Sequence, residues 1–179
     1  KDRIQEIEKK IKGKKLEIIK IEAKKKKKNA PLLYDLTELQ REANQKFGFS
    51  AKETLNIMQR LYENHKVLTY PRTDSRYLTS DVVGTIKDRL QAINSGVYRE
   101  YAAPLLKKQI TAKASFVNDS KVGDHHAIIP TEQAPSYLHM SNEEKKIYDM
   151  VVRRFLAVLY PSCEYEETVI AGMIEGEAF

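Results

Sequence analysis

The sequence predicts a mainly helical α+β fold, in which a helical domain with a few short strands is flanked by strands of a neighbouring module. Ser50 and Ser141 are each followed three residues later by a glutamate, which is the capping-box pattern of a helix start. Apolar residues recur at helical spacing after both positions. Near the two ends of the chain, residues 16–23 and 164–179 instead alternate loosely between apolar and polar side chains, which indicates strands.

Start and stop signals place the helices along the chain. The first predicted helix ends at Gly13, and the lysine run after residues 16–23 is interpreted as a break. Thr37 and Gln40 fit a further capping box. The predicted helices span residues 2–12, 38–46, 51–64, 81–93, 98–108 and 142–160.

Glycine and proline set several of these boundaries. Gly48 is expected to end the second helix, Pro104 to break the helix over 98–108, and Pro161 to stop the last one. Residues 114–117 are predicted to form a short strand. The apolar stripe of the helix over 51–64 is predicted to comprise Ala51, Leu55, Met58, Leu61 and Tyr62.

The composition excludes some classes of protein. Of the 179 residues, 41% are hydrophobic, which is enough for a packed core, but no apolar run approaches the ~18 residues of a membrane span. The single cysteine, Cys163, excludes an internal disulfide framework and favours a reducing, cytoplasmic setting. The chain begins at Lys1 and stops at Phe179 in mid-pattern, so we interpret it as a fragment of a longer protein.

The net charge of +6 is distributed unevenly. Residues 1–30 hold 13 basic and 5 acidic side chains, whereas residues 31–179 hold 18 and 20. The basic surplus therefore belongs to the N-terminal arm, mostly to Lys24–Lys28. A lysine run of this kind is more often a solvated surface than a DNA-binding one. If the remainder binds nucleic acid, it must do so through local charges.

Tyr70 is a candidate nucleophile. Pro71 favours extended backbone at Tyr70, and residues two apart in an extended segment share a face, so Arg72 lies on the side of Tyr70. An ordinary phenol has a pKa near 10 and needs nearby positive charge or a proton acceptor to attack. Arg72 suits that role, and its guanidinium also suits binding of a phosphate through two hydrogen bonds. The Asp74 carboxylate is expected either to orient Arg72 or to offset its charge. The residues alone leave open a tyrosine that merely packs on a helix end.

His125 and His126 form the second candidate group. Imidazole changes charge near neutral pH, so it suits phosphate binding or proton movement. A turn histidine beside a buried apolar segment is the competing explanation. No cysteine or carboxylate cluster has the spacing of a metal site, so no metal ligand is assigned to this chain.

Several segments of the sequence, taken together, resemble those of type IA DNA topoisomerases. The segment Leu68-Thr69-Tyr70-Pro71-Arg72-Thr73-Asp74-Ser75, with Leu61-Tyr62-Glu63 before it, resembles the family's active-site signature. Residues 39–43 and 48–52 resemble the helices that precede it. His125-His126-Ala127-Ile128-Ile129-Pro130-Thr131 resembles the second signature.

The likeness covers about residues 31–160, and residues 148–155 resemble the helix that closes this domain. Pro71 and the doubled histidine are typical of the topoisomerase III branch. The resemblance implies an ATP-independent enzyme that cleaves and rejoins one strand of single-stranded DNA through a 5′-phosphotyrosyl link. It thereby relaxes negative supercoils or decatenates DNA.

The same resemblance implies roles for individual residues. Tyr70 is the expected nucleophile, Arg72 holds the scissile phosphate, and His125 is the phosphate-side histidine. The expected DNA-binding residues on the same surface are Tyr62, Gln40, His126, Asp74 and Arg76. For Tyr62 and Gln40, helix packing or capping remains an equal alternative.

The resemblance further implies modules outside these residues. An acidic module of the same parent chain is expected to supply the Mg²⁺ ligands, so this chain binds no cofactor and the isolated fragment is expected to be inactive. Residues 1–30 and 159–179 are expected to belong to an arch-forming β-module. The catalytic-tyrosine domain then spans 31–158, with a helix-turn-helix-like part over 38–78.

Two rival functions remain at the level of sequence. One is a non-catalytic, helix-turn-helix-like DNA-binding module, for which a Tyr70→Phe change has no consequence. The other is a structural helical domain with a basic tail that binds no DNA. The near-neutral charge of residues 31–179 argues against strong binding of duplex DNA.

Overall fold

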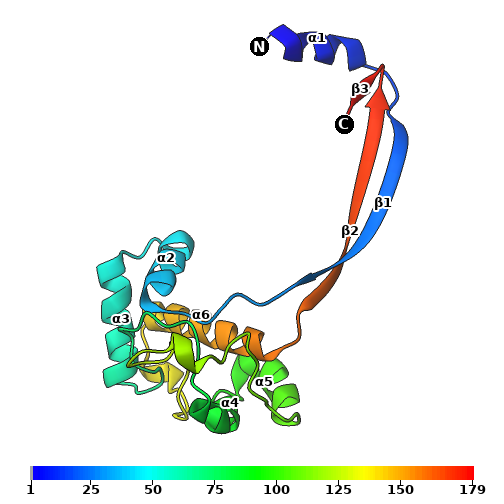
Figure 1. The fold of residues 1–179 in the computed structure, drawn as a ribbon. Helices are drawn as coiled ribbons and strands as arrows, with labels where there is room; N and C mark the ends of the chain where they lie inside the picture. Colours follow the sequence, from blue (N-terminus) through cyan, green and yellow to red (C-terminus); the bar gives the residue numbers. More distant parts are fainter. Residues whose placement is uncertain (1) are drawn as a thin grey trace. The chain divides into compact units, whose positions relative to one another are not determined.

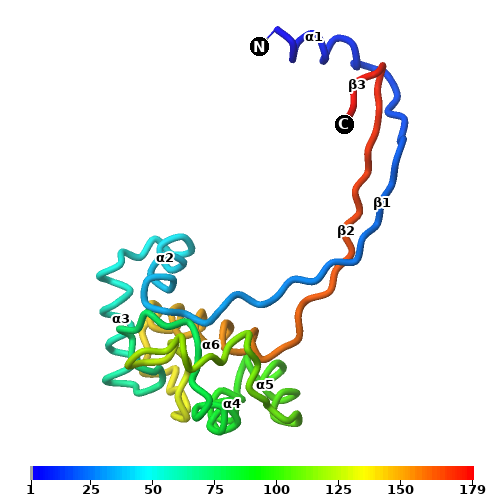
Figure 2. The backbone as a smooth tube through the Cα atoms, viewed as in Figure 1, coloured from blue at the N-terminus to red at the C-terminus, as the bar shows by residue number. Residues whose placement is uncertain are grey.

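The computed structural model describes residues 2–179 and confirms a mainly helical α+β fold (Figures 1 and 2). The chain divides into two compact units: one combines the residues up to Asn29 with Ser162–Phe179, and the other is Ala30–Pro161. No helix among the described residues is long and apolar enough to cross a membrane. The helices and strands are α1 (Asp2–Ile11), β1 (Glu17–Lys28), α2 (Leu36–Phe47), α3 (Ala51–Glu63), α4 (Ile86–Ala92), α5 (Arg99–Leu106), α6 (Asn142–Leu159), β2 (Cys163–Ile174) and β3 (Glu177–Ala178).

The core of the helical unit is built around α6. This helix buries side chains on several sides, among them Tyr148 and Phe155, and it packs against both α3 and α5. Helix α2 packs on α3, and α4 packs on α5. Long connections between these helices add further core residues, such as Phe116 and Ile129. The unit therefore has one continuous hydrophobic core into which the loops also pack.

Side-chain caps fix the starts of three helices. Ser50 and Ser141 form the two predicted capping boxes with Glu53 and Glu144, so these predictions are confirmed. The predicted start at Thr37 is wrong. The cap of α2 is Asp35, whose carboxylate accepts from the Glu38 backbone N–H at 2.6 Å.

Gly48 ends α2 as predicted, with a positive φ of 74° that glycine adopts without strain. The buried side of α3 differs from the predicted stripe. It comprises Thr54, Ile57, Met58 and Leu61, whereas Ala51 and Tyr62 are exposed. The helix is thus rotated so that Tyr62 faces away from the core.

Three other local predictions need correction. Residues 81–93 form a 3₁₀ turn followed by the short helix α4. Pro104 lies inside α5 rather than ending it, with its ring exposed at the surface. Residues 114–117 form no strand: turn bonds to the Lys113 carbonyl shape them, and only Val117 makes a single bridge, to Leu78.

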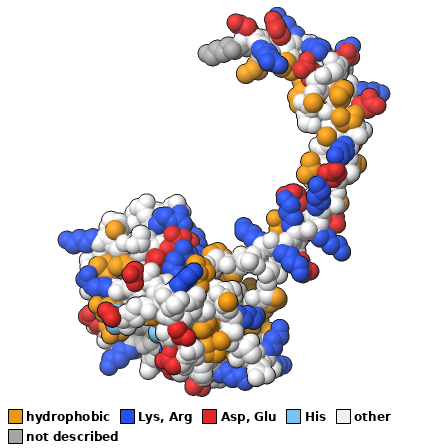
Figure 3. Space-filling model, in the orientation of Figure 1, with side chains coloured by type: hydrophobic (Ala, Val, Ile, Leu, Met, Phe, Trp, Pro, Cys, Tyr) orange, Lys and Arg blue, Asp and Glu red, His pale blue; other side chains and the backbone are white. Residues whose placement is uncertain are grey.

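Figure 3 shows acidic and basic side chains interspersed along the ribbon of the other unit. Here β1 pairs antiparallel with β2, and the short β3 pairs with the far end of β2. The predicted break at the lysine run is wrong, because Lys24–Lys28 form part of β1 and pair with Cys163–Glu167. Their side chains are exposed, and ion pairs join Lys26 to Glu167 and Lys27 to Glu164. The lysines are thus solvated on a strand rather than in a loop.

Candidate functional site

The segment that carries Tyr70 follows directly after α3. A tight turn in which Lys66 has a φ of +55° reverses the chain, and the Val67 N–H donates to the Leu61 carbonyl at 3.0 Å. Leu68 then forms a bridge with Pro130. Tyr70 is half-buried and lies outside any helix or strand, directly before a bend at Pro71.

Burial alternates along the residues that follow Tyr70. Pro71, Thr73 and Ser75 are buried, whereas Arg72 and Asp74 are exposed. This alternation of burial places Tyr70, Arg72 and Asp74 on the outward side of the segment. Within residues 2–179, however, no hydrogen bond or ion pair joins Asp74 to Arg72, so the expected orienting contact is not seen.

Backbone hydrogen bonds hold the segment 125–131 beside the Tyr70 segment. The Thr69 N–H donates to the Ile129 carbonyl at 3.0 Å, and the Ala127 N–H donates to the Tyr77 carbonyl at 2.9 Å. The Thr73 hydroxyl donates to the His125 carbonyl at 2.8 Å. The two sequence signatures therefore form one layer, although more than fifty residues separate them.

A buried arginine secures the other end of this layer. Arg89 of α4 donates from Nη1 to the Pro130 carbonyl at 2.8 Å and forms an ion pair with Glu132 at 2.8 Å. Its Nε also donates to the Thr85 hydroxyl. Arg89 thus fixes the chain where it leaves the segment 125–131.

Three aromatic rings meet at Tyr70. The Tyr70 and His125 ring centroids lie 4.3 Å apart with a 41° angle between the planes. The Tyr62 ring meets Tyr70 edge-on, with centroids 5.5 Å apart. All three residues line an open cleft of about 650 Å³, together with Glu63, Lys66, Leu68, Thr69 and Thr131.

The remaining predicted residues lie in other environments. Gln40 donates from Nε2 to the Ala51 carbonyl at 3.0 Å, at the start of α3. Arg76 donates from Nε to the Leu33 carbonyl at 3.0 Å. These bonds give both side chains a structural role, which is the helix-packing alternative in the case of Gln40.

His126 differs from its neighbour. Its ring is half-buried, whereas His125 is exposed, and its Nδ1 lies 2.7 Å from the Ala127 carbonyl. Burial is the main cause that lowers the pKa of His126 below its usual value, against the opposing effect of that hydrogen bond. His126 is therefore neutral at neutral pH, with Nδ1–H donating to the carbonyl.

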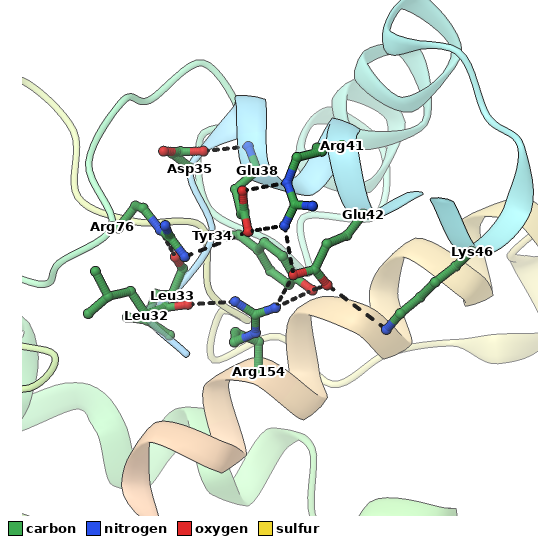
Figure 4. Close-up of polar contacts among 10 residues, drawn as sticks. All are labelled: Leu32, Leu33, Tyr34, Asp35, Glu38, Arg41, Glu42, Lys46, Arg76 and Arg154. Atoms are coloured by element: carbon green, nitrogen blue, oxygen red, sulfur yellow. Dashed lines mark hydrogen bonds and ion pairs between the residues drawn. The ribbon is translucent and has the colours of Figure 1, made fainter. Parts of the chain in front are cut away.

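A second polar cluster, which the sequence did not reveal, joins α6 to α2 and to the segment before it (Figure 4). The buried Arg154 of α6 donates to the Leu32 carbonyl at 2.8 Å and to the Tyr34 hydroxyl at 2.9 Å, and it pairs with Glu42 at 2.5 Å. The Tyr34 hydroxyl in turn donates to Glu42 at 2.6 Å. More than a hundred residues separate Arg154 from these partners, and no local pattern signals such contacts.

The electrostatics of this cluster follow from burial and pairing. Burial raises the pKa of the Tyr34 phenol, and its bond to Glu42 adds to the effect. Burial alone would raise the pKa of Glu42, but hydrogen bonds from Tyr34 and Arg154 outweigh it and lower the pKa. Glu42 is therefore ionised at neutral pH, and the cluster holds a paired charge that fixes α2 and the Leu32–Tyr34 segment to α6.

The described residues contain no group of three or more histidine, cysteine or acidic side chains that fits a metal ion. Among the described residues that line the cleft around Tyr70, Glu63 is the one carboxylate.

Comparison with known proteins identifies the family. The family model described as DNA topoisomerase matches residues 1–179. The chain is 55% identical over 179 residues to a DNA topoisomerase 3 of Bacillus cereus, covering all of this chain and 25% of that protein. It is 52% identical over 171 residues to DNA topoisomerase 3 of Bacillus subtilis, covering 96% of this chain and 24% of that protein.

Among solved structures, full-length topoisomerase I from Thermotoga maritima matches with a TM-score of 0.65 and 26% identity, over 99% of this chain and 28% of that one. The chain thus spans about a quarter of the length of the curated relatives it matches. The resemblance to type IA topoisomerases, with curated relatives named topoisomerase 3, is confirmed. This chain belongs to the DNA topoisomerase family.

Proposed function

We propose that the protein containing this chain cleaves and rejoins one strand of single-stranded DNA, with Tyr70 as the nucleophile. The observation that carries the proposal is the aromatic group of Tyr62, Tyr70 and His125 in one open cleft. Tyr70 is positioned by backbone bonds on a rigid layer and still reaches solvent. Family membership supports DNA as the substrate.

The proposed reaction is a transesterification. The Tyr70 phenolic oxygen attacks a phosphorus of the strand, the bond from phosphorus to the 3′-oxygen breaks, and a 5′-phosphotyrosyl link forms. The phenol loses its proton and the departing 3′-oxygen gains one. The free 3′-hydroxyl then reverses the link after strand passage, so relaxation or decatenation needs no ATP.

The residues around Tyr70 serve this reaction by charge and shape. Arg72, exposed on the same outward face, is proposed to bind the scissile phosphate through its planar guanidinium. His125, whose ring contacts that of Tyr70 at a tilt, is proposed to contact the phosphate or move a proton. Tyr62 offers an exposed ring on which a base can stack.

Other predicted contacts have smaller proposed roles. Asp74 shares the outward face with Arg72 and is kept as a candidate DNA contact. His126, Gln40 and Arg76 make the structural bonds described above, and we propose that they support DNA binding mainly by holding the site's framework. Mg²⁺ in the full-length enzyme is proposed to be held by acidic residues outside this chain. The isolated chain is therefore expected to be inactive.

The sharpest test changes Tyr70 to Phe in the full-length enzyme. The expected result is complete loss of the covalent DNA adduct on denaturing gels, with single-strand binding largely retained, because only the attacking oxygen is removed. Tyr77→Phe is the matched control, since Tyr77 lies seven residues along the same segment outside the cleft, and it should retain the adduct. Adduct at the parent level in Tyr70→Phe would overturn the proposal.

The same experiment separates the rival functions. A non-catalytic DNA-binding module built on α2 and α3 would bind DNA with a sequence preference and give no adduct in either protein. A purely structural domain would show no salt-dependent binding of single strands. Either result in the unmutated enzyme would replace the proposed reaction.

A further inference from the structure

Lys66 has an unusual backbone for a lysine. Its φ of +55° is left-handed, and among the described residues only one other non-glycine, Glu175, has a positive φ. Such a conformation is strained for a residue with a Cβ, and glycine would adopt it freely just after a helix. The strain at Lys66 therefore suggests a use for its side chain.

The position of Lys66 suggests what this use is. Lys66 is exposed and lines the same cleft as Tyr70 and His125. Among the described residues lining this cleft, it carries the one permanent positive charge, and Glu63 carries a negative one. Within residues 2–179, no ion pair involves the Lys66 ammonium, so its charge is available to a ligand.

The backbone of Lys66 is held firmly to the cleft wall. The Thr131 hydroxyl donates to the Lys66 carbonyl at 2.6 Å, and the Thr131 N–H donates to the next carbonyl, that of Val67, at 3.0 Å. Thr131 itself lines the cleft. The flexible side chain thus starts from a fixed point beside the aromatic group, as a phosphate-binding lysine requires.

We propose that Lys66 binds a backbone phosphate of the DNA strand in the cleft, next to the phosphate that Tyr70 attacks. This inference rests on the proposed function and deepens it. Arg72 does not line the cleft, so the two cations serve different phosphates: Arg72 the scissile one and Lys66 a neighbour along the strand. Lys66 is a binding and positioning residue, because it holds the strand and takes no part in the bond change.

The test uses the full-length enzyme with Tyr70→Phe, so that cleavage does not complicate binding. Lys66→Asn and Lys66→Gly remove the charge while keeping residues that accept a left-handed backbone. Lys66→Arg keeps the charge. Lys107→Asn is the control, since Lys107 is exposed at the end of α5 and does not line the cleft. The probe is an oligonucleotide of single-stranded DNA titrated at several salt concentrations.

In Lys66→Asn and Lys66→Gly, the slope of log affinity against log salt should decrease by about 0.7, the value for one phosphate contact with single-stranded DNA, and binding should weaken several-fold. Lys66→Arg and Lys107→Asn should keep the full slope. Melting temperatures of the Asn and Gly variants should not fall, because the backbone strain is relieved, so weaker binding cannot be attributed to unfolding.

Unchanged slopes in Lys66→Asn and Lys66→Gly would overturn the inference and leave Lys66 as a turn residue only. An equal decrease in Lys107→Asn would also overturn it, because the effect would then be long-range. Failure of the proposed function is recognised separately: with Tyr70 intact, the parent enzyme and its Lys107→Asn variant should form the covalent adduct. If no protein with Tyr70 forms an adduct, the reaction is wrong whatever the slopes show.

Discussion

Arg153 and Arg154 are adjacent in sequence and have very different surroundings. Arg154 is buried, stacks on the Tyr34 ring at 4.0 Å and pairs with Glu42. Arg153 is exposed and pairs with Asp149 one helical turn away. Burial decides the energetic weight of each pair, because water and salt screen the exposed charges.

Replacing Arg154 with leucine should destabilise the helical unit by about 2 kcal/mol, because half-buried Glu42 loses its charged hydrogen-bond donor and the Leu32 carbonyl loses its partner. The matched change Arg153→Leu should cost less than about 0.5 kcal/mol. Urea denaturation of the two variants, followed by circular dichroism, measures both values. Equal losses would show that the buried cluster adds nothing beyond an ordinary surface pair.

Part of the candidate site could be predicted at this scale and part could not. The absence of helix at Tyr70 follows from Pro71, because that preference is local. The contact between the His125 and Tyr70 rings depends on hydrogen bonds such as that from Thr73 to the His125 carbonyl, which no local pattern encodes. The family resemblance supplied the pairing that local physics does not reveal.

At the scale of elements, helix starts are predictable when one cap dominates. Ser50 and Ser141 each have a glutamate three residues later, and both boxes form. Ahead of α2, however, Thr37 and Asp35 compete for the N-cap position. The Asp35 carboxylate takes it and accepts from the Glu38 backbone N–H, because the helix dipole favours negative charge at the N-terminus. The helix then begins earlier, and Gln40 is free to reach the start of α3.

At the lysine run, by contrast, the local sequence predicts the wrong structure. Five successive like charges repel one another, which favours a loop in an isolated peptide. The glutamates that neutralise them, Glu164 and Glu167, lie on β2 about 140 residues away. Cross-strand pairs of opposite charge favour pairing, so a strand forms where the local sequence alone opposes it.

Glu144 joins two helices and gives the fold a dependence on pH. It caps α6 through Ser141 and accepts from Arg60 of α3 at 2.6 Å. Burial opposes its ionisation, but the hydrogen bonds from Arg60 and Ser141 and the neighbouring His65 outweigh this and lower its pKa. Because the folded pKa lies below the unfolded one, ionised Glu144 stabilises the fold above about pH 4.5, and this contribution disappears as pH falls through the folded pKa.

Glu144→Gln should therefore reduce the free energy of unfolding by about 2 kcal/mol near neutral pH, because charge-assisted bonds to Arg60 are lost. As the pH falls below about 4.5 and Glu144 of the parent becomes protonated in turn, the difference should shrink. The measurement is urea denaturation of both proteins across this range. The adjacent Glu143→Gln change is the control and should have a smaller effect, since Glu143 is fully exposed. A difference that stays constant with pH would contradict the linkage.

At the scale of the whole molecule, the two units differ in what holds them together. The Ala30–Pro161 unit contains nearly all of the buried hydrophobic side chains. In the other unit, β1 is exposed along almost its entire length and α1 buries no residue. Surface ion pairs such as Lys10 with Glu177 join its parts, and such pairs contribute little on their own.

Residues 30–161 should consequently fold alone and melt cooperatively, because the segment is continuous and retains its core. In the 179-residue chain, amide hydrogens of β1 and β2 should exchange much faster than those of α3 and α6. The ribbon is only two strands wide along most of its length and its side chains are mostly exposed, so it is marginal in water. Hydrogen exchange measured by mass spectrometry on both chains tests this. If β1 amides were protected as strongly as those of α6, the ribbon would be stabilised by something other than its strand pairing. If removing residues 1–29 and 162–179 unfolded α6, the core of the helical unit would depend on the ribbon, and the division into two units would not describe folding.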